Sequence, residues 1–359
     1  MITDEPVTYA ESNQTRFETD DLTRDTRSVG TGITLPPDEI LERRFHLVTG
    51  KGGVGKSTVA MTLGIAFAQR GLRTLICEVD HREMMTRAFQ VPPSQAAIKE
   101  VSDQLYVVSI DTQTALSEYG MLKLKVRALS SLLTENPITR ALVSIVPGVA
   151  DLIALGKAFN HERERDQQGY VWDRVIVDAP STGHGLTFIR LPQVIRDVVP
   201  YGNMRREADE MWALLSDSSR SAIHIVTTPE ELPAQETLEL WRKLNDDLDL
   251  QPHALWINMD EPQVLSDDDW SVILEAQSHT QLCPQVVHML KCLDLRRCGT
   301  INKAQYLSRL AQIKAPRAKI PQILANTPSA LRVIITTQLR RLSAQLSSTK
   351  LNKVEEDHS

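Results

Sequence analysis

The stretch that most restricts the fold of this chain is GKGGVGKS, residues 50–57. It fits the pattern G-x-x-x-x-G-K-[ST], and it lies between an apolar run at 45–48 and a run with helical spacing at 56–70. A phosphate-binding loop needs this context, because its glycines let backbone N–H groups converge on phosphate oxygens at a helix N-terminus. The stretch therefore predicts a nucleotide site; the alternative is a glycine-rich turn that binds no nucleotide.

The rest of the chain alternates short β-branched runs with amphipathic segments, which is typical of βα units. Strands are predicted at 45–48, 73–79, 106–110, 174–177, 222–227 and 254–258, and further helices at 203–215 and 232–247. The predicted fold class is α/β, a P-loop NTPase with a mainly parallel sheet flanked by helices.

Between residues 110 and 172 the chain has no strand signal and is cut by Pro137 and Pro147, which predicts a helical insertion at about 112–171. We expect a P-loop domain at 41–348, preceded by a disordered acidic arm at 1–40 and followed by a flexible tail at 349–359. The arm has nine acidic and three basic residues, a net charge of −6 that equals the formal charge of the whole chain.

The remaining body is electrically balanced, so we expect neither a general nucleic-acid-binding surface nor a polybasic membrane patch. The chain has no apolar run long enough to span a bilayer, and its start lacks the apolar core of a signal peptide. Its four cysteines show no C-x-x-C spacing. These features favour a soluble protein of the reducing cytoplasm.

The loop assigns chemistry to individual residues. We expect Lys56 to bridge the β- and γ-phosphates of ATP, Ser57 to bind Mg²⁺, and Thr58 to lie near the α-phosphate. The predicted nucleotide-binding residues of this segment are Gly50, Lys51, Gly52, Gly53, Val54, Gly55, Lys56, Ser57 and Thr58.

Two other segments end in acids. In RVIVDAPSTGHG, Asp178 ends an apolar strand and is predicted to hold Mg²⁺ through water, with a γ-phosphate-sensing turn at 180–183; the alternative is a simple turn former. In TLICEVDHREM, an acid after the strand is predicted to orient the attacking water. Asp80 is favoured over Glu78 for this role, and the alternative is that either merely caps the next segment.

With these elements in order, the chain resembles the deviant Walker A ATPases of the ArsA family, which includes arsenical pump-driving ATPases and the tail-anchored-protein targeting factor. GKGGVGKST matches the family's loop, and DAPSTGH echoes its second switch, D-T-A-P-T-G-H, with the spacing from Asp178 to His184 kept. The resemblance covers about residues 45–320. It implies that His184 is a switch hydrogen-bonding residue or a catalytic one.

The resemblance also implies roles for three further residues. Lys51, the early lysine of the deviant loop, would reach the nucleotide of the other subunit in a homodimer; the alternative is a solvated loop lysine. Asn258, in ALWINM, would recognise adenine, which an amide suits because it both donates and accepts; a strand-end turn former is the alternative. Pro316 would belong to the loop that covers the base.

This sequence differs from the family's motifs at several places, which limits the roles that can be carried over. The family's first switch, D-P-x-[HQ], is Asp80-His81-Arg82-Glu83 here, so the role of Asp80 rests on alignment. The scattered cysteines argue against arsenite sensing, and the missing C-x-x-C removes a zinc clasp. The apolar residues of the insertion are either a client groove or ordinary core.

The sequence thus predicts a Mg²⁺-dependent ATPase that acts as a nucleotide-gated homodimer on an unidentified protein partner or client, with Asp80, Lys51 and Lys56 as its catalytic residues. The alternative is a nucleotide-dependent positioning or scaffold protein, like the septum-placing and plasmid-partitioning relatives, that acts at a membrane or DNA surface. The segment PSALRVIITTQLRRLSAQLSSTK carries basic residues among apolar ones, so it could bind a membrane surface peripherally, which would favour the scaffold alternative. The favoured interpretation of this segment is a terminal helix docked on the domain.

Overall fold

The structure is a computed structural model. It describes residues 33–79, 83–94, 97–110, 149–180, 185–198, 200–261, 266–279 and 283–356. Most of the predicted helical insertion lies outside these ranges, and its last part forms the helix α7.

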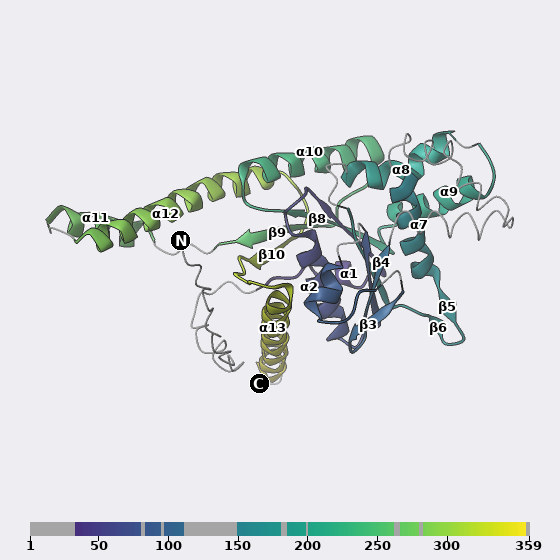
Figure 1. The fold of residues 1–359 in the computed structure, drawn as a ribbon, viewed down its shortest axis with the longest axis horizontal. Helices are drawn as coiled ribbons and strands as arrows, with labels where there is room; N and C mark the ends of the chain where they lie inside the picture. The colour runs from purple at the N-terminus through teal and green to yellow at the C-terminus, as the bar shows by residue number, and fades with distance from the viewer. Residues whose placement is uncertain are drawn as a thin grey trace, which may run out of the picture. The chain divides into compact units, whose positions relative to one another are not determined.

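An eight-stranded sheet forms the centre of the fold, with the strand order β10-β9-β8-β1-β7-β2-β4-β3 (Figure 1). Its neighbouring strands are all parallel except β3, which runs antiparallel to β4 at one edge. The strands are β1 (Phe45–Gly50), β2 (Thr74–Val79), β3 (Lys99–Ser102), β4 (Leu105–Ile110), β7 (Arg174–Asp178), β8 (Ser221–Thr227), β9 (Ala254–Asp260) and β10 (Arg317–Pro321). This mainly parallel sheet confirms the predicted α/β class.

Helices cover both faces of the sheet (Figure 1). They are α1 (Asp38–Leu41), α2 (Lys56–Ala68), α3 (Met84–Ala88), α7 (Val149–Arg163), α8 (Gly185–Val198), α9 (Asn203–Ser216), α10 (Glu231–Leu248), α11 (Asp267–His279), α12 (Pro284–Leu310) and α13 (Pro328–Glu356).

The two faces have separate hydrophobic cores. On β2, Leu75 and Cys77 belong to the core shared with α7, α8, α9, α10 and α12, whereas Ile76 belongs to the core shared with α1, α2, α3 and α13. Successive side chains of a strand point to opposite faces, so a strand covered on both sides must be apolar along its whole length. This explains why the central strands appear in the sequence as short continuous apolar runs.

Three strand features differ from the sequence prediction. The edge strands β3 and β10 have half-exposed residues and so lack the continuous apolar run of the inner strands. The region predicted to have no strand contains a small hairpin, β5 (Arg165–Asp166) and β6 (Gly169–Tyr170). Its strands are two residues long, which is too short for a periodic signal.

Both ends of the domain also differ from the predicted boundaries. Residues 33–40, assigned to the acidic arm, are packed: Ile33 and Ile40 are buried, and Thr34 pairs with Lys319 of β10. These few apolar side chains join the core beside α2, although the surrounding composition is polar. At the other end, the backbone of α13 remains helical to Glu356, beyond the predicted start of the tail at 349.

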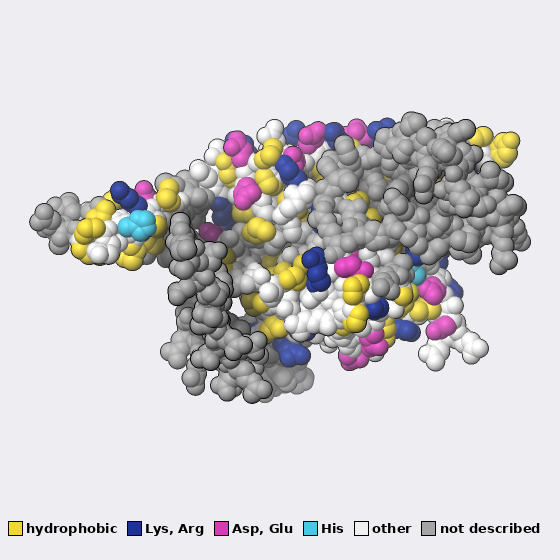
Figure 2. Space-filling model, in the orientation of Figure 1, with side chains coloured by type: hydrophobic (Ala, Val, Ile, Leu, Met, Phe, Trp, Pro, Cys, Tyr) yellow, Lys and Arg dark blue, Asp and Glu magenta, His cyan; other side chains and the backbone are white. Residues whose placement is uncertain are grey.

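The C-terminal helix α13 is docked on the domain, as the sequence favoured. Ile335 and Leu339 are buried in the core next to α2, and the Arg332 guanidinium lies 5.3 Å from the centre of the Phe89 ring. Within the described ranges, no helix is both long and apolar enough to cross a bilayer. On the described part of the face in Figure 2, lysine and arginine side chains are interspersed with acidic ones.

A fully buried chain of hydrogen bonds links three central strands. Trp256 Nε1 donates to His224 Nδ1 at 3.1 Å, the two histidines are joined at 3.0 Å, and His46 Nε2 lies 2.7 Å from the carbonyl of Arg43. An indole N–H can only donate, so both imidazoles must be neutral, each with its proton on Nε2. Burial lowers the pKa of His46 to about 3 and that of His224 well below its ordinary value.

Candidate functional site

The predicted phosphate loop joins β1 to α2, and its backbone demands glycine at two positions. Gly50 has φ +147°, and a Cβ there would lie 2.4 Å from the Val226 carbonyl oxygen. Gly55 has φ +89°, and a Cβ there would lie 2.0 Å from Nδ2 of Asn258. Both conformations are rare for residues with a side chain. The glycines therefore let the loop turn tightly against β8 and β9 before α2 begins.

The lysine and serine of the loop both have partners in the fold. Lys56 is buried, and its Nζ donates to the carbonyl oxygen of Lys51 at 3.0 Å. Ser57 Oγ donates to Asp178 Oδ2 at 2.5 Å. Asp178 ends β7, the strand beside β1, so the loop and the second predicted element meet directly. The contact follows from the sheet, because the carboxyl ends of neighbouring parallel strands lie at one edge.

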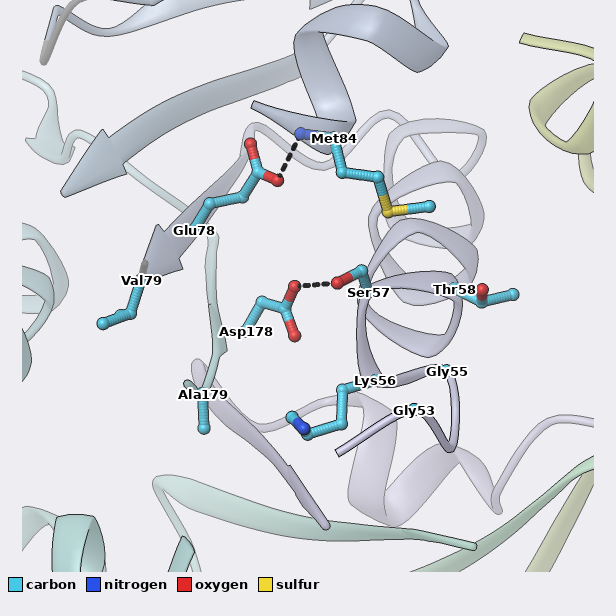
Figure 3. A pocket seen from close by; sticks show the side chains of 10 residues that line it. All are labelled: Gly53, Gly55, Lys56, Ser57, Thr58, Glu78, Val79, Met84, Asp178 and Ala179. Atoms are coloured by element: carbon cyan, nitrogen blue, oxygen red, sulfur yellow. Dashed lines mark hydrogen bonds between the residues drawn. The ribbon is translucent and has the colours of Figure 1, made fainter. Parts of the chain in front are cut away.

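A cavity of about 210 Å³ lies at this edge. Its lining residues come from the loop and α2, from the ends of β2 and β7, and from the start of α3 (Figure 3): Gly53, Gly55, Lys56, Ser57, Thr58, Glu78, Val79, Met84, Asp178 and Ala179. The predicted site residues whose side chains line the cavity are Lys56, Ser57 and Thr58 of α2 and Asp178 of β7. The lining also contains Met84, which the sequence did not single out.

Glu78 is the second acid of the cavity. It is paired in register with Asp178 on the neighbouring strand and is only 2% exposed. Its Oε1 accepts hydrogen bonds from the backbone N–H groups of Met84 and Met85, at 2.9 and 3.2 Å. Its Oε2 is buried and has no hydrogen-bond partner among the described residues. Burial, together with the Asp178 carboxylate, raises the pKa of Glu78 to about 7.

Lys51 is not among the residues that line the cavity. Its Nζ lies 2.7 Å from Oε1 of Glu236 on α10, and both side chains are partly exposed. In a single chain, the Lys51 side chain is therefore paired with Glu236 and not with a group of the cavity. Glu236 lies 185 residues further along the sequence, and no local pattern identifies it.

Asn258 and Pro316 are not among the residues that line the cavity. Asn258 is buried, and its Nδ2 donates to the carbonyl oxygen of Val54 at 2.9 Å, so its amide holds the phosphate loop against β9. Pro316 is exposed, and its carbonyl oxygen accepts a hydrogen bond from the Leu255 N–H at 2.9 Å. Adenine recognition by either residue stays a prediction.

Asp80 and His184 lie outside the described residues, as do His81 and Arg82 of the first switch and residues 181–183 of the predicted turn. Their predicted roles also stay predictions. Val79, the residue before Asp80, lines the cavity.

Comparison with known proteins agrees with this geometry. The model of the anion-transporting ATPase family matches residues 43–211, which include the loop, both acidic strand ends and α8. The ATPase BagA of Mycobacterium tuberculosis is 30% identical over 247 residues, which cover 67% of this chain and 72% of the relative.

More distant relatives cover less of either chain. A putative arsenical pump-driving ATPase of Halobacterium salinarum is 28% identical over 243 residues, 63% of this chain and 37% of that protein. The ATPase GET3 of Lachancea thermotolerans is 29% identical over 164 residues, 44% of this chain and 47% of that protein. The loop, the strand-end acids and these similarities lead to one conclusion: the chain belongs to the ArsA-type, anion-transporting ATPase family.

Proposed function

We propose that this protein hydrolyses ATP to ADP and phosphate with Mg²⁺, by direct attack of water on the γ-phosphate. The observation that carries the proposal is the convergence of Lys56, Ser57 and Asp178 on one cavity at the N-terminus of α2. The helix end and the loop amides favour an anion, and the buried ammonium of Lys56 supplies a positive charge for the β- and γ-phosphates.

The oxygen donors of the cavity fit Mg²⁺. This ion binds through hydroxyl, carboxylate, phosphate and water oxygens and usually keeps several waters. Ser57 Oγ lies 2.5 Å from Asp178 Oδ2, so an ion bound beside the serine would also be close to the aspartate. The bound ion would neutralise charge on the phosphates, while Ser57 and Asp178 hold it in place.

The water-orienting role is assigned to Asp80, which follows the cavity-lining residue Val79 by one position. Glu78 remains the alternative, because it is an acid that lines the cavity itself. Orientation of the water is enough for such a residue, since phosphoryl transfer depends mainly on positioning and charge stabilisation.

The protein is further proposed to act as a nucleotide-gated homodimer in which Lys51 reaches the partner's nucleotide. For this, Lys51 must exchange the Glu236 carboxylate for phosphate oxygens, and both are anionic partners for an ammonium. The exposed location of the Lys51–Glu236 pair supports this exchange, because such pairs contribute only about 0–1 kcal/mol.

The output of the cycle is proposed to be a change of shape that acts on an unidentified protein partner or client in the cytoplasm. The name of one relative, a putative arsenical pump-driving ATPase, supports ATP-driven work on another molecule. It does not name the partner of this chain.

The first test of the proposal is nucleotide binding, which ATP hydrolysis requires. Titration calorimetry with Mg²⁺ and a non-hydrolysable ATP analogue should give saturable binding to the wild-type protein and none to Lys56→Ala. The matched control is Lys243→Ala, which removes an exposed lysine paired with Glu239 on α10 and should leave binding unchanged. Equal binding by Lys56→Ala and the wild type would refute the proposal.

A further inference from the structure

Glu78 is a buried carboxylate among other negative charges. The charged groups that act on it are Asp178 and Glu83, which are both acids, and no ion pair of Glu78 occurs among the described residues. Its only hydrogen bonds there come from two backbone N–H groups, and both go to Oε1. A buried carboxylate without a cation is costly, so this arrangement points to a positive ligand in the cavity.

A helix-capping role does not account for the whole side chain. Capping the start of α3 uses Oε1 alone, and a neutral glutamine could supply the same acceptor. The second oxygen, Oε2, is buried and has no hydrogen-bond partner among the described residues. Glu78 itself is paired in register with Asp178 on the neighbouring strand. In Figure 3, Ser57 faces Asp178, while the Glu78 carboxyl group turns towards the start of α3.

We propose that Glu78 is a positioning residue of the Mg²⁺ site: its Oε2 accepts a hydrogen bond from a water bound to the ion, and its Oε1 ties the occupied site to the start of α3. This proposal rests on the proposed function. It adds Glu78 to the Mg²⁺ site that is proposed for Ser57 and Asp178. Met84 lines the cavity and Met85 is part of the core, so the anchored segment joins the site to the packed interior.

The isosteric variant Glu78→Gln separates the two tasks. Its carbonyl oxygen can keep the Met84 and Met85 hydrogen bonds, but its NH₂ group cannot accept a hydrogen bond from a metal-bound water. The matched control is Glu239→Gln, because Glu239 is an exposed acid of α10 that pairs with Lys243 and does not line the cavity.

Electron paramagnetic resonance can count free Mn²⁺, used in place of Mg²⁺, in the presence of saturating ADP. Loss of an outer-shell acceptor typically weakens metal affinity about 10- to 100-fold, so Glu78→Gln should raise the Mn²⁺ dissociation constant by at least about tenfold. In EDTA, binding of a fluorescent ATP analogue should stay equal or become tighter, because a negative charge near the phosphates is removed. Glu239→Gln should behave as the wild type in both assays.

Two results would overturn the inference: an unchanged Mn²⁺ dissociation constant, or an equal loss of nucleotide binding with Mn²⁺ and in EDTA, which would indicate a merely structural role. Hydrogen exchange of the wild-type protein provides a test that needs no variant. Adding Mg²⁺ to the ADP-bound protein should slow exchange in the peptide that contains Met84 and Met85, and unchanged exchange contradicts the proposal. Absence of any nucleotide binding by the wild type would instead refute the proposed function itself.

Discussion

Acidification should destabilise this protein through His46, whose buried imidazole cannot accept a proton without breaking the hydrogen-bond chain to His224 and Arg43. Its pKa falls from an ordinary value of 6.5 to about 3 on folding. Below pH 6.5 the unfolded chain therefore binds a proton that the folded chain does not, and the free energy of unfolding falls with pH. Between pH 7 and pH 5 this single residue removes about 2 kcal/mol.

Other groups titrate in the same range, so the wild-type curve alone does not isolate His46. The pKa of His224 is also lowered, and it acts in the same direction. The pKa of Glu78 is raised to about 7, so that its folded form binds a proton first and stability gains as pH falls towards its unfolded value of 4.5. A comparison of two proteins that share both groups cancels these effects.

The informative variant is His46→Asn, because an asparagine oxygen can replace Nδ1 as the acceptor for His224 but does not titrate. Urea denaturation of both proteins, followed by circular dichroism at pH 7 and pH 5, gives the loss of stability for each. The wild type should lose about 2 kcal/mol more than His46→Asn over this interval. An equal loss in the two proteins would refute the assignment of His46 as a buried neutral base.

Three further predictions concern the loop, the core and the dimer. Gly55→Ala should abolish nucleotide binding in a calorimetric titration, since a methyl group there meets a side-chain nitrogen at 2.0 Å. Arg220→Met should lower the free energy of unfolding in urea by about 2 kcal/mol, because the fully buried Glu162 loses the Arg220 Nη2 group that donates to both of its oxygens; no change would contradict this. Mixing Lys51→Ala with Asp80→Asn subunits should restore ATPase activity that each variant lacks, and no recovery at any ratio argues against action in trans.

The sequence identifies residues that the structure brings together where they follow neighbouring strands. The loop after β1 and the acid at the end of β7 had to meet, because both follow carboxyl ends of neighbouring parallel strands. The same argument places Glu78 beside Asp178, yet it could not decide which acid of TLICEVDHREM enters the cavity. Glu78 lines the cavity, whereas Asp80 lies outside the described residues, so the choice between them stays open.

Contacts between distant segments could not be predicted. Lys51 meets Glu236 across 185 residues, and Asn258 meets Val54 across 204, and neither pair has a local pattern. For Asn258, the sequence suggests an amide that recognises adenine, whereas in the structure its Nδ2 donates to the carbonyl oxygen of Val54 in the phosphate loop. Likewise, Ile33 and Ile40 join the core from a segment whose overall composition resembles a disordered arm.

The central claim is that the cavity formed by Lys56, Ser57 and Asp178 hydrolyses ATP. Its most direct test is phosphate release from ATP by the purified full-length chain, measured in excess Mg²⁺ and in EDTA beside the Lys56→Ala variant. We expect release by the wild type in Mg²⁺ and only background release in EDTA or from Lys56→Ala. Release from Lys56→Ala at the wild-type rate, or none from the wild type above that background, would contradict the central claim.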